Sequence, residues 1–495
     1  MKTDSRGIMI NIDINSSITG FLNDASKKEN VTESDLYPFV DCYRDSQVTD
    51  VLICGFCQFS QTPSLVFSDF AFKCGQKTEN GVSVDYTNWF GGNTILHTKY
   101  GIDPYDVWFR RLKTLGIRPW LSVRMNDCHC PDEEACFLRS EFFYEAREKG
   151  WMVGPEYGYY RYCFNYAVPE VRAKMLAYLR EQLTRYDVYG LELDFQREII
   201  CFDYLHDPEC HKIMTAFLRE VRALVKEMET VHGHKLVVAV RLARDIEQNK
   251  IYGFDAEAIA NEKLADLFII APRWATCDSG MPIAEWVRRF PDISVVAGLE
   301  ILVNRQDDHA YASPEVVRGY TSEYLAEGSD GIYLFNHFFT PEAPAWQEIY
   351  HTCGYPATVD SLPRRFVVTY QDICPANCTA WHPLPMPADG RELRVGFGHS
   401  AEKLSLIFSL VSGNSISDLA SVTVNGETFS AFAPTEHGHE PNACYAQPEQ
   451  SLYKVNLPKS VYRDRSALTV SFRSADGKEP VLIGYLEIDA DGSES

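Results

Sequence analysis

The chain has 495 residues, of which 45% are hydrophobic, 13% aromatic and 23% charged, a globular composition with an excess of aromatic rings. It carries 69 acidic and 47 basic residues, a formal net charge of −22. A surface this acidic repels nucleic acid and anionic membranes, and no apolar run approaches the roughly 18 residues of a membrane span. We therefore expect neither nucleic acid nor a membrane as a partner.

The N-terminus and the cysteines bear on the compartment. The first residues, MKTDSRGIMINIDI, hold a short apolar run interrupted by Asn11 and Asp13, so no signal peptide is predicted. The 15 cysteines are an odd number, and several lie within or beside apolar segments, as Cys54 and Cys57 do. That pattern is typical of reduced thiols, and we expect a cytoplasmic protein.

From the N-terminus to about residue 352, short β-branched runs alternate with amphipathic stretches, the pattern of parallel βα units. The eight predicted strands cover residues 8–14, 50–56, 117–123, 188–195, 235–241, 266–272, 293–300 and 331–337. Helices are predicted between them, with Thr32 capping one, Pro169 opening another and Gly328 ending a third. Eight such repeats predict an α/β fold, a (β/α)8 TIM barrel, in residues 1–355.

Two connections are too long to be simple turns. Residues 57–102 and 125–167 follow the second and third strands and are rich in Gly, Asn, Tyr and Phe. Because they leave the carboxyl ends of strands, where such barrels build their sites, we predict that they form walls of a substrate pocket. The alternative is decoration without ligand contact.

The pattern changes near residue 356. Turn-rich segments now separate short alternating strands such as SLIFSLV, ASVTVNG, ALTVSFRS and VLIGYLEID. Residues 356–495 are therefore predicted to form a C-terminal β-sandwich, jelly-roll-like accessory domain. We expect this domain either to bind carbohydrate or to pack beside the barrel. Packing is favoured, because no row of exposed aromatic residues can be read from the sequence.

Polar side chains gather where the predicted barrel strands end, the face on which TIM barrels place their sites. They are Arg124, Asn126 and Asp127 after strand three; Glu192, Asp194, Gln196 and Arg197 at strand four; Arg241, Arg244 and Asp245 after strand five; Arg273 and Trp274 after strand six; Glu300 in strand seven; and Asn336 and His337 after strand eight. We predict that this set lines one pocket.

The stretch YGLELDFQRE supplies the first catalytic candidate. A period of two points Glu192, Asp194 and Gln196 into the barrel, where inward carboxylates need partners or a task. Glu192 lies deeper, and an ion pair with Arg124 or Arg241 would account for it. Asp194 lies nearer the mouth and is predicted to be catalytic, with the same kind of ion pair to Arg124 or Arg241 as the alternative.

Glu300 supplies the second carboxylate. It ends strand seven, which is expected to lie across the ring from strand four. Glycoside hydrolysis needs two carboxyl groups flanking the scissile bond, and we predict that Asp194 and Glu300 form this pair. The alternative partners of Asp194 are Glu198, Asp127, Asp245 and Asp278.

The arginines at the strand ends allow two interpretations. Arg124, Arg197, Arg241, Arg244 and Arg273 cluster there in an otherwise acidic chain. Guanidinium groups recognise carboxylate, sulfate or phosphate, so the set would suit an anionic sugar such as a uronic or sialic acid. Alternatively, the arginines neutralise the carboxylates beside them.

Other polar and aromatic groups complete the expected pocket. Asn336 and His337 are candidates for sugar hydroxyls, with a structural role as the alternative for His337. The rings that could stack on a sugar face, if they are not core, are Trp120, Trp274, Phe335, Phe338, Tyr157, Tyr159 and Tyr160. The run NDCHCPDEEAC lacks paired metal-ligand spacing, and no dinucleotide, P-loop or serine-hydrolase motif occurs, so we expect no metal and no cofactor.

Three stretches carry a resemblance to a known family: WLSVRMND, FNYAVPEVRAKMLAYLREQLTRYDVYGLELDFQRE and GSDGIYLFNHF. They resemble the glycosyl-hydrolase-like (β/α)8 barrels of bacterial carbohydrate utilisation. The resemblance spans most of residues 8–352 and implies a catalytic barrel with an acidic residue of strand four, here Asp194, at its centre. We therefore expect a glycoside hydrolase, exo-acting on small oligosaccharides. The alternatives are a non-catalytic or degenerate carbohydrate-binding barrel and a uronate lyase or epimerase. The sequence leaves the sugar and the homo-oligomeric state open.

Overall fold

The structure is a computed structural model, and it describes most residues of the chain. These are residues 7–13, 18, 21–22, 30–68, 76–79, 82–85, 91–129, 131–132, 136, 138–273, 276–300, 302–304, 309–336, 344–369, 374–376, 378, 382–398, 403–436 and 451–491.

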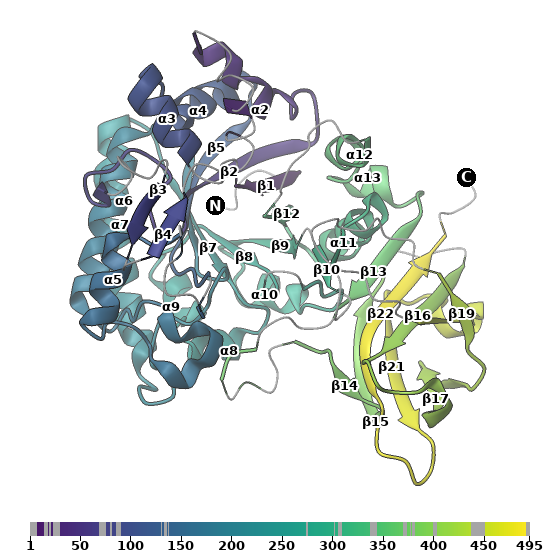
Figure 1. Ribbon diagram of the computed structural model, residues 1–495. Helices are drawn as coiled ribbons and strands as arrows, with labels where there is room; N and C mark the ends of the chain where they lie inside the picture. Colours follow the sequence, from purple (N-terminus) through teal and green to yellow (C-terminus); the bar gives the residue numbers. More distant parts are fainter. Residues whose placement is uncertain are drawn as a thin grey trace.

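Eight parallel strands close into a barrel in the order β1-β12-β9-β8-β7-β6-β5-β2 (Figure 1). Their bounds are β1 Ile8–Ile12, β2 Val48–Phe56, β5 Arg118–Arg124, β6 Gly190–Asp194, β7 Val237–Leu242, β8 Leu267–Ile270, β9 Ser294–Glu300 and β12 Ile332–Phe335. All eight predicted strands are present and the predicted TIM barrel is confirmed, with strand ends shifted by a few residues.

Helices surround the barrel (Figure 1). They are η1 Glu33–Leu36, α2 Pro38–Asp41, α3 Gly91–Tyr100, α4 Pro104–Thr114, α5 Glu141–Glu148, η3 Pro155–Tyr162, α6 Pro169–Arg185, α7 Cys210–His232, α8 Ile246–Ile251, α9 Ala256–Asn261, α10 Ile283–Arg289, α11 Pro314–Ala326, α12 Pro344–Thr352 and α13 Pro356–Val359. The helix expected to follow Thr32 is instead two short pieces, η1 and α2, because Pro38 cannot continue the first one.

The two long connections carry structure of their own. The β3–β4 hairpin (Gln76–Glu79 and Val82–Asp85) and α3 follow β2, while α5 and η3 follow β5. A second small hairpin, β10 (Leu302–Asn304) with β11 (His309–Tyr311), follows β9. All three insertions leave carboxyl ends of barrel strands. None of the helices in the described residues combines the length and apolar character that crossing a bilayer requires.

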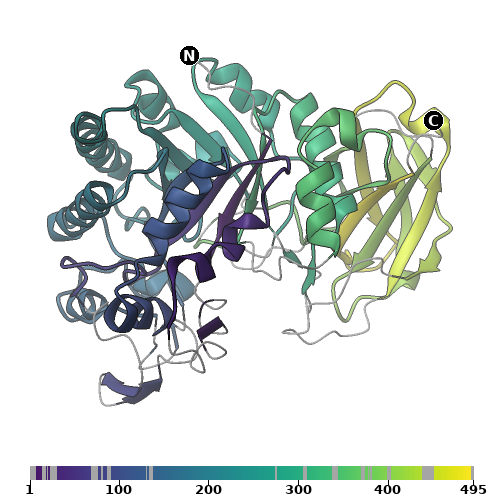
Figure 2. The same cartoon turned by 90° about the horizontal axis from the view of Figure 1, so that it is seen from above.

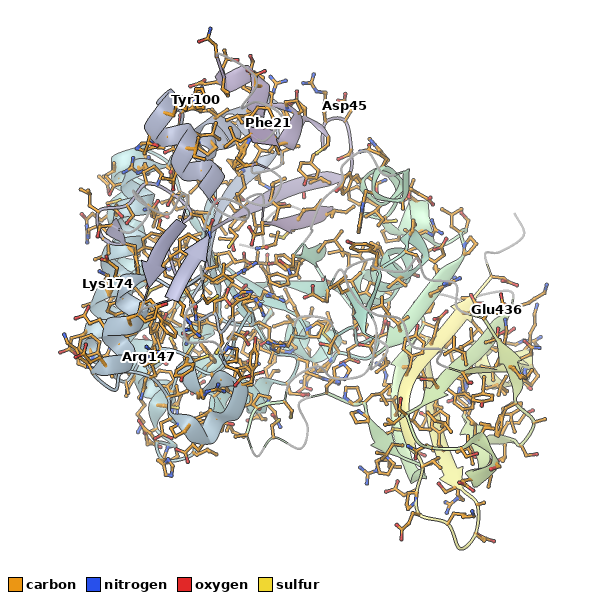
Figure 3. The ribbon with its side chains drawn as sticks, in the orientation of Figure 1. Phe21, Asp45, Tyr100, Arg147, Lys174 and Glu436 are labelled. Carbon is orange, nitrogen blue, oxygen red and sulfur yellow. The ribbon has the colours of Figure 1, made fainter. Side chains whose placement is uncertain are left out.

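The barrel has two apolar layers, as the alternation of its strands demands. Leu191, Leu193 and Phe195 of the β6 segment pack between the strands and the helices. Trp120 and Tyr333 belong to the separate cluster that fills the barrel interior. An outer helix also contacts the connection that follows β2. In Figure 3, Lys174 of α6 lies on the barrel side remote from the sandwich, and its ammonium is 4.9 Å from the ring centre of Phe67 in that connection.

The C-terminal region forms two antiparallel sheets, as predicted for a β-sandwich. One has the order β13-β22-β16-β20-β19, with β14 beside β22, and the other the order β15-β21-β17-β18. The bounds are β13 Arg364–Val368, β14 Met386–Pro387, β15 Asp389–Gly396, β16 Leu404–Leu410, η4 Ile416–Asp418, β17 Leu419–Val424, β18 Glu427–Phe429, β19 Ala433–Thr435, β20 Leu452–Leu457, α14 Lys459–Tyr462, β21 Ala467–Ser474 and β22 Leu482–Ala490.

Barrel and sandwich meet along α11. Figure 2 shows the green helices of the barrel's last repeats between the two parts, and α11 packs directly on β13. At Gly319 of α11 a side chain would collide with the Arg365 carbonyl, since a Cβ there would lie 2.1 Å from the oxygen. The predicted domain boundary at residue 355 falls between α12 and α13, ahead of β13, and stays a prediction.

Candidate active site

Asp194 and Arg241 form the centre of a buried cluster at the carboxyl ends of the barrel strands. The two residues are register partners on β6 and β7, and both side chains are fully buried. Nη1 of Arg241 donates to both carboxylate oxygens, at 3.1 and 3.2 Å. Oδ1 of Asp194 also accepts the backbone N–H groups of Gln196 and Arg197 at 3.0 and 2.8 Å. Asp194 is therefore a firmly held carboxylate.

Glu192 lies one layer deeper and is a carboxyl group of another kind. It accepts hydrogen bonds from the Tyr333 hydroxyl at 2.6 Å and from Nδ2 of Asn11 at 2.9 Å. Burial, followed by the negative charge of Asp194, raises the pKa of Glu192 to about 7. Near neutral pH this group can hold or release a proton. The ion pair with Arg124 or Arg241 that the sequence suggested is replaced by hydrogen bonds to uncharged partners.

A second part of the cluster is built around Arg124 of β5. Its guanidinium donates to Asp127 at 3.2 Å, to Asp13 at 3.3 Å and to Oδ1 of Asn336 at 3.1 Å. Asp127 also contacts Nδ1 of His129. Burial acts to raise the pKa of Asp127, but His129, Arg197 and Arg124 together hold it well below its usual range.

Arg197 fixes the tautomer of His129. A guanidinium nitrogen of Arg197 lies 3.1 Å from Nε2 of His129, and guanidinium groups only donate. Nε2 must therefore accept, which leaves the proton of a neutral ring on Nδ1, facing Asp127. This pair of contacts joins the loop after β5 to the loop after β6.

Glu198 anchors the third part. Arg273 clamps its carboxylate with two hydrogen bonds of 3.1 and 2.9 Å, and Arg197 adds a third of 3.1 Å. The phenol of Tyr159, on the η3 segment, is 3.5 Å from the same carboxylate. Loops after β5, β6 and β8 thus converge on Glu198, which the sequence offered only as an alternative partner of Asp194.

Glu300 is buried at the end of β9. In the closed ring, β6 and β9 are separated by β7 and β8 on one side and by four strands on the other. The expectation that the two strands lie opposite each other is therefore wrong, because opposite strands of an eight-membered ring have three on each side. Arg241 lies on the intervening strand β7. Burial acts to lower its pKa, but the negative charges around it, those of Asp194 and Glu300 among them, raise that pKa above its usual value.

Two of the predicted pocket residues, Asn126 and Arg244, make structural contacts. Asn126 donates to the backbone oxygens of Phe164 and Ile200 at 3.1 and 3.0 Å and accepts the Phe164 N–H at 2.8 Å. Arg244 forms an ion pair of 2.5 Å with Asp278 beside the C-terminal domain. Neither side chain joins the cluster around Asp194 through these contacts.

Several predicted residues cannot be placed or belong to the core. Trp274, His337 and Phe338 lie outside the described residues. Trp120 and Phe335 fill the barrel interior, and the Trp120 indole donates to Asp50 at the amino-terminal end. Tyr157 and Tyr160 are buried, whereas Tyr159 is half-buried and faces Glu198 and Arg273.

The sequence interpretation missed Asn11, Asp13, Gln58, His129 and Tyr333 as members of the cluster. Asn11 and Asp13 lie at the end of the first strand, where in the sequence they only interrupt a short apolar run. Tyr333 belongs to an apolar-looking strand. The position of Gln58, directly after β2, was the signal that could have identified it.

Two buried amide groups at this face have unused oxygens. Gln196 and Gln58 are 1% and 2% exposed, and Oε1 of each accepts no hydrogen bond within the part of the chain that the structure describes. Gln58 also has a left-handed backbone, with φ of 63°, as does Asn336 with φ of 55°. Unsatisfied buried groups and strained backbone both cost free energy, and both concentrate at functional sites.

One group of described residues has the composition of a metal site. Glu156, Asp203 and His206 bring ligand atoms within 4.8 Å of one another on the loops after β5 and β6. Asp203 accepts from the Tyr157 phenol at 2.7 Å and lies 2.8 Å from Nδ1 of His206. Exposed groups of this kind are common without an ion, and we assign no metal to them.

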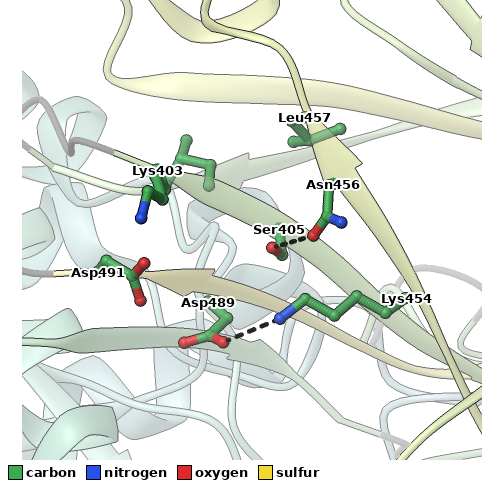
Figure 4. A pocket seen from close by; sticks show the side chains of 8 residues that line it. Lys403, Ser405, Lys454, Asn456, Leu457, Asp489 and Asp491 are labelled. Carbon is green, nitrogen blue, oxygen red and sulfur yellow. Dashed lines mark hydrogen bonds and ion pairs between the residues drawn. The ribbon is translucent and has the colours of Figure 1, made fainter.

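A polar pocket of about 300 Å³ lies on the sandwich. Figure 4 shows it over β16, β20 and β22, with Ser405 donating to Asn456 at 3.0 Å and Lys454 3.7 Å from Asp489. Every lining residue belongs to the C-terminal region, so this pocket is separate from the barrel cluster. It holds paired charges and no aromatic ring.

A closed (β/α)8 barrel with a carboxylate and arginine cluster at its strand ends thus defines the architecture. No family model and no curated protein matches the chain. Among solved structures, it is similar to α-L-fucosidase isoenzyme 1 of Paenibacillus thiaminolyticus (14% identity, covering 96% of this chain and 97% of that one, TM-score 0.37).

It is also similar to the PgaB (BpsB) glycoside hydrolase domain of Bordetella bronchiseptica (11% identity, 71% of this chain and 99% of that one, TM-score 0.44). A third similar structure is a β-hexosaminidase mutant of Streptomyces plicatus (8% identity, covering 72% of this chain and 65% of that one, TM-score 0.40). These structural neighbours are glycoside hydrolases, and the likeness lies in the fold.

Proposed function

We propose that the protein is a glycoside hydrolase. The observation that carries the proposal is the pair of unlike carboxyl groups on β6: Asp194 is ion-paired with Arg241, whereas the pKa of Glu192 is raised to about 7. Glycoside hydrolysis requires one ionised carboxylate and one carboxyl group that retains a proton near neutral pH. The carboxyl ends of barrel strands are the place where such groups act.

Asp194 and Glu300 remain the proposed catalytic pair. Among the described residues, Arg241 alone donates to Oδ2 of Asp194, whereas Oδ1 accepts three hydrogen bonds. Oδ2 is therefore the atom suited to attack or to activate water. Glu300 would act on the other side of the scissile glycosidic bond. The guanidinium of Arg241, on the strand next to Asp194, would favour the ionised form of both carboxyl groups. Glu192 would supply protons from the layer below.

The arginines favour a neutral sugar. Arg124, Arg197, Arg241 and Arg273 already bind carboxylates of the chain itself. A uronic or sialic acid would have to compete with these buried partners, so the described contacts support the second of the two interpretations of the arginines. The unused oxygens of Gln196 and Gln58 would instead accept hydrogen bonds from sugar hydroxyl groups.

A non-catalytic carbohydrate-binding barrel is the second candidate. The observation that favours it is the complete burial of Asp194 between Arg241 and two backbone N–H groups. A carboxylate held in this way can stabilise a binding pocket without reacting. Turnover decides between the two functions.

The test is a screen against 4-nitrophenyl glycosides of neutral hexoses, N-acetylhexosamines, fucose and uronic acids, with unsubstituted oligosaccharides beside them. We expect the wild type to hydrolyse at least one neutral glycoside, and Asp194→Asn and Glu300→Gln to lower kcat by about 10²- to 10⁴-fold. Asp50→Asn, at the opposite end of the barrel, is the control and should retain kcat.

Sugar-induced thermal stabilisation without turnover in the wild type would identify a binding protein. An ultraviolet-absorbing unsaturated product from a uronate would identify a lyase. Either result contradicts the proposed function.

A further inference from the structure

The connection from β8 to α10 reaches from the barrel cluster to the C-terminal sandwich. It begins at the cluster, where Arg273 clamps Glu198 with hydrogen bonds of 3.1 and 2.9 Å. Further along the same connection, Cys277 to Gly280 lie against the sandwich. One short segment therefore touches both a proposed site and a domain whose role the sequence left open.

The backbone of this segment pairs with the edge of the sandwich, as an additional strand would. The backbone N–H of Thr369 donates to the Cys277 carbonyl at 3.0 Å, and the N–H of Ser279 donates to the Val367 carbonyl at 2.9 Å. Asp278 and Val368 form an antiparallel bridge between them. The pairing runs beside the last two residues of β13 and the following Thr369, and such backbone pairing fixes the position of both segments.

Side chains strengthen the same junction. The Thr369 hydroxyl accepts the N–H of Cys277 at 2.8 Å. The Tyr324 hydroxyl of α11 accepts the N–H groups of Gly280 and Met281 at 3.1 and 3.2 Å. Asp278 is paired with Arg244 at 2.5 Å. The backbone N–H groups of Cys277 to Met281 thus all have partners in the C-terminal region or α11, which holds this part of the connection in place.

Cys277 carries the contact back to the barrel. It is fully buried, and its sulfur lies 3.6 Å from the carbonyl oxygens of both Glu300 and Leu302, either of which can accept the single thiol proton. The residue paired with the sandwich through its backbone thus touches the end of β9 through its side chain. The backbone that carries Glu300 is supported from the sandwich side.

We propose that the C-terminal sandwich is a positioning element for the barrel cluster. Thr369 and Cys277 are the positioning residues: Thr369 fixes the β8–α10 connection, and Cys277 transmits that constraint to the backbone of Glu300. The N–H of Thr276, next to Cys277, donates to the Arg273 carbonyl at 3.0 Å, and through this contact the same constraint reaches Arg273 and its partner Glu198. Only the catalytic meaning of this arrangement rests on the proposed function, since the mechanical link is independent of it.

The test is hydrogen–deuterium exchange of the full chain carrying Thr369→Val, a substitution that removes the hydroxyl and keeps the shape. We expect exchange to become about tenfold faster or more in residues 276–282 and also, at lesser amplitude, in 294–300 and 195–200. Thr423→Val is the matched control, since its hydroxyl bonds to the Thr428 hydroxyl within the sandwich at 3.0 Å. It should leave these segments unchanged.

Cys277→Ala separates the two steps of the link and serves if Thr369→Val does not fold. It keeps the backbone pairing and removes the thiol from Glu300, so exchange should rise at 294–300 with little change at 364–369. Cys353→Ala, another buried thiol that contacts the Pro314 carbonyl at 3.8 Å, is its control.

Faster exchange confined to residues 276–282 and 364–369 in Thr369→Val, with 294–300 unaffected in both variants, would show that the sandwich merely packs and would overturn the proposal. Exchange at 294–300 that rises in a chain without glycosidase turnover would refute the proposed function and leave this inference standing.

Discussion

The two ends of the barrel use buried charge in opposite ways. At the amino-terminal end, Asp50 accepts two hydrogen bonds from Arg118 and one from the Trp120 indole. Asp266 likewise accepts the N–H of Val238 and a guanidinium nitrogen of Arg222 at 2.9 Å each. Each carboxylate there is matched by donors from its neighbours.

At the carboxyl end the charges form one extended group. Its buried members are Asp13, Asp127, Glu192, Asp194, Glu198 and Glu300, with Arg124, Arg197, Arg241 and Arg273. Beside them lie the buried amide oxygens of Gln58 and Gln196, which accept no hydrogen bond from the described residues. Stability does not explain unsatisfied amide oxygens, whereas the two carboxylates at the amino-terminal end both meet donors.

Breaking the central ion pair should have the largest effect on stability. Asp194→Ala leaves Arg241 buried without its carboxylate, and we expect the free energy of unfolding to fall by about 3–5 kcal/mol. Asp50→Ala should cost less, about 2 kcal/mol, because the Arg118 side chain is 22% exposed and can turn to water. Urea unfolding measures both.

The double substitution Asp194→Ala with Arg241→Met provides the control, because replacing both charges by apolar groups should restore part of the loss. Equal losses at Asp194 and Asp50, without rescue by Arg241→Met, would contradict the contrast between the two ends.

The pH dependence of stability should reveal Glu192. Its pKa rises from an unfolded value near 4.5 to about 7 in the folded protein, so between these values the folded state binds the extra proton. Its contribution to stability is complete below pH 4.5 and is lost as pH rises to about 7, by up to about 3 kcal/mol.

Glu192→Gln, which cannot ionise, should remove that part of the pH dependence in unfolding experiments between pH 5 and 8. Glu247→Gln, at an exposed carboxylate of α8, serves as the comparison and should preserve the wild-type slope. A wild-type slope retained in Glu192→Gln would assign the proton elsewhere.

Two amides of the carboxyl end should respond differently to apolar replacement. Asn126→Leu loses three hydrogen bonds to the backbone and should lower the free energy of unfolding by about 2–3 kcal/mol. Gln196→Met loses no hydrogen bond through Oε1, so its stability should stay within about 1 kcal/mol of the wild type. On a hydrolysed glycoside, Gln196→Met should raise KM.

Thermal unfolding and steady-state kinetics distinguish the two variants. If Gln196→Met proved as destabilising as Asn126→Leu, the Gln196 amide would be structural and its proposed role in binding sugar would fail.

The smallest effect is expected at Gln58. Glycine tolerates φ of 63°, so Gln58→Gly should relieve about 1 kcal/mol of backbone strain, offset in part by the lost hydrogen bond to the Asp127 carbonyl. Its melting temperature should therefore change little while turnover falls. Lys263→Gly, with φ of 56° at an exposed position, should stabilise the chain and leave turnover intact; a loss of turnover there would break the comparison.

The sequence by itself determined the barrel, the sandwich and the inward face of β6. The periodicity of apolar residues is a local property, so each alternating strand and each amphipathic helix can be recognised by itself. Eight such repeats leave few possible topologies for the sheet. The period of two also placed Glu192 below Asp194, because it depends on one strand only.

Only the tertiary structure decided which groups meet. Asn11 reaches Glu192 and Arg241 reaches Asp194 across neighbouring or distant strands, and the separation of β6 from β9 follows from the closed order of the ring. Burial is equally non-local: it raises the pKa of Glu192, although an isolated strand with the same residues would be hydrated. The link from Thr369 through Cys277 to Glu300 joins three distant segments, and no local pattern marks it.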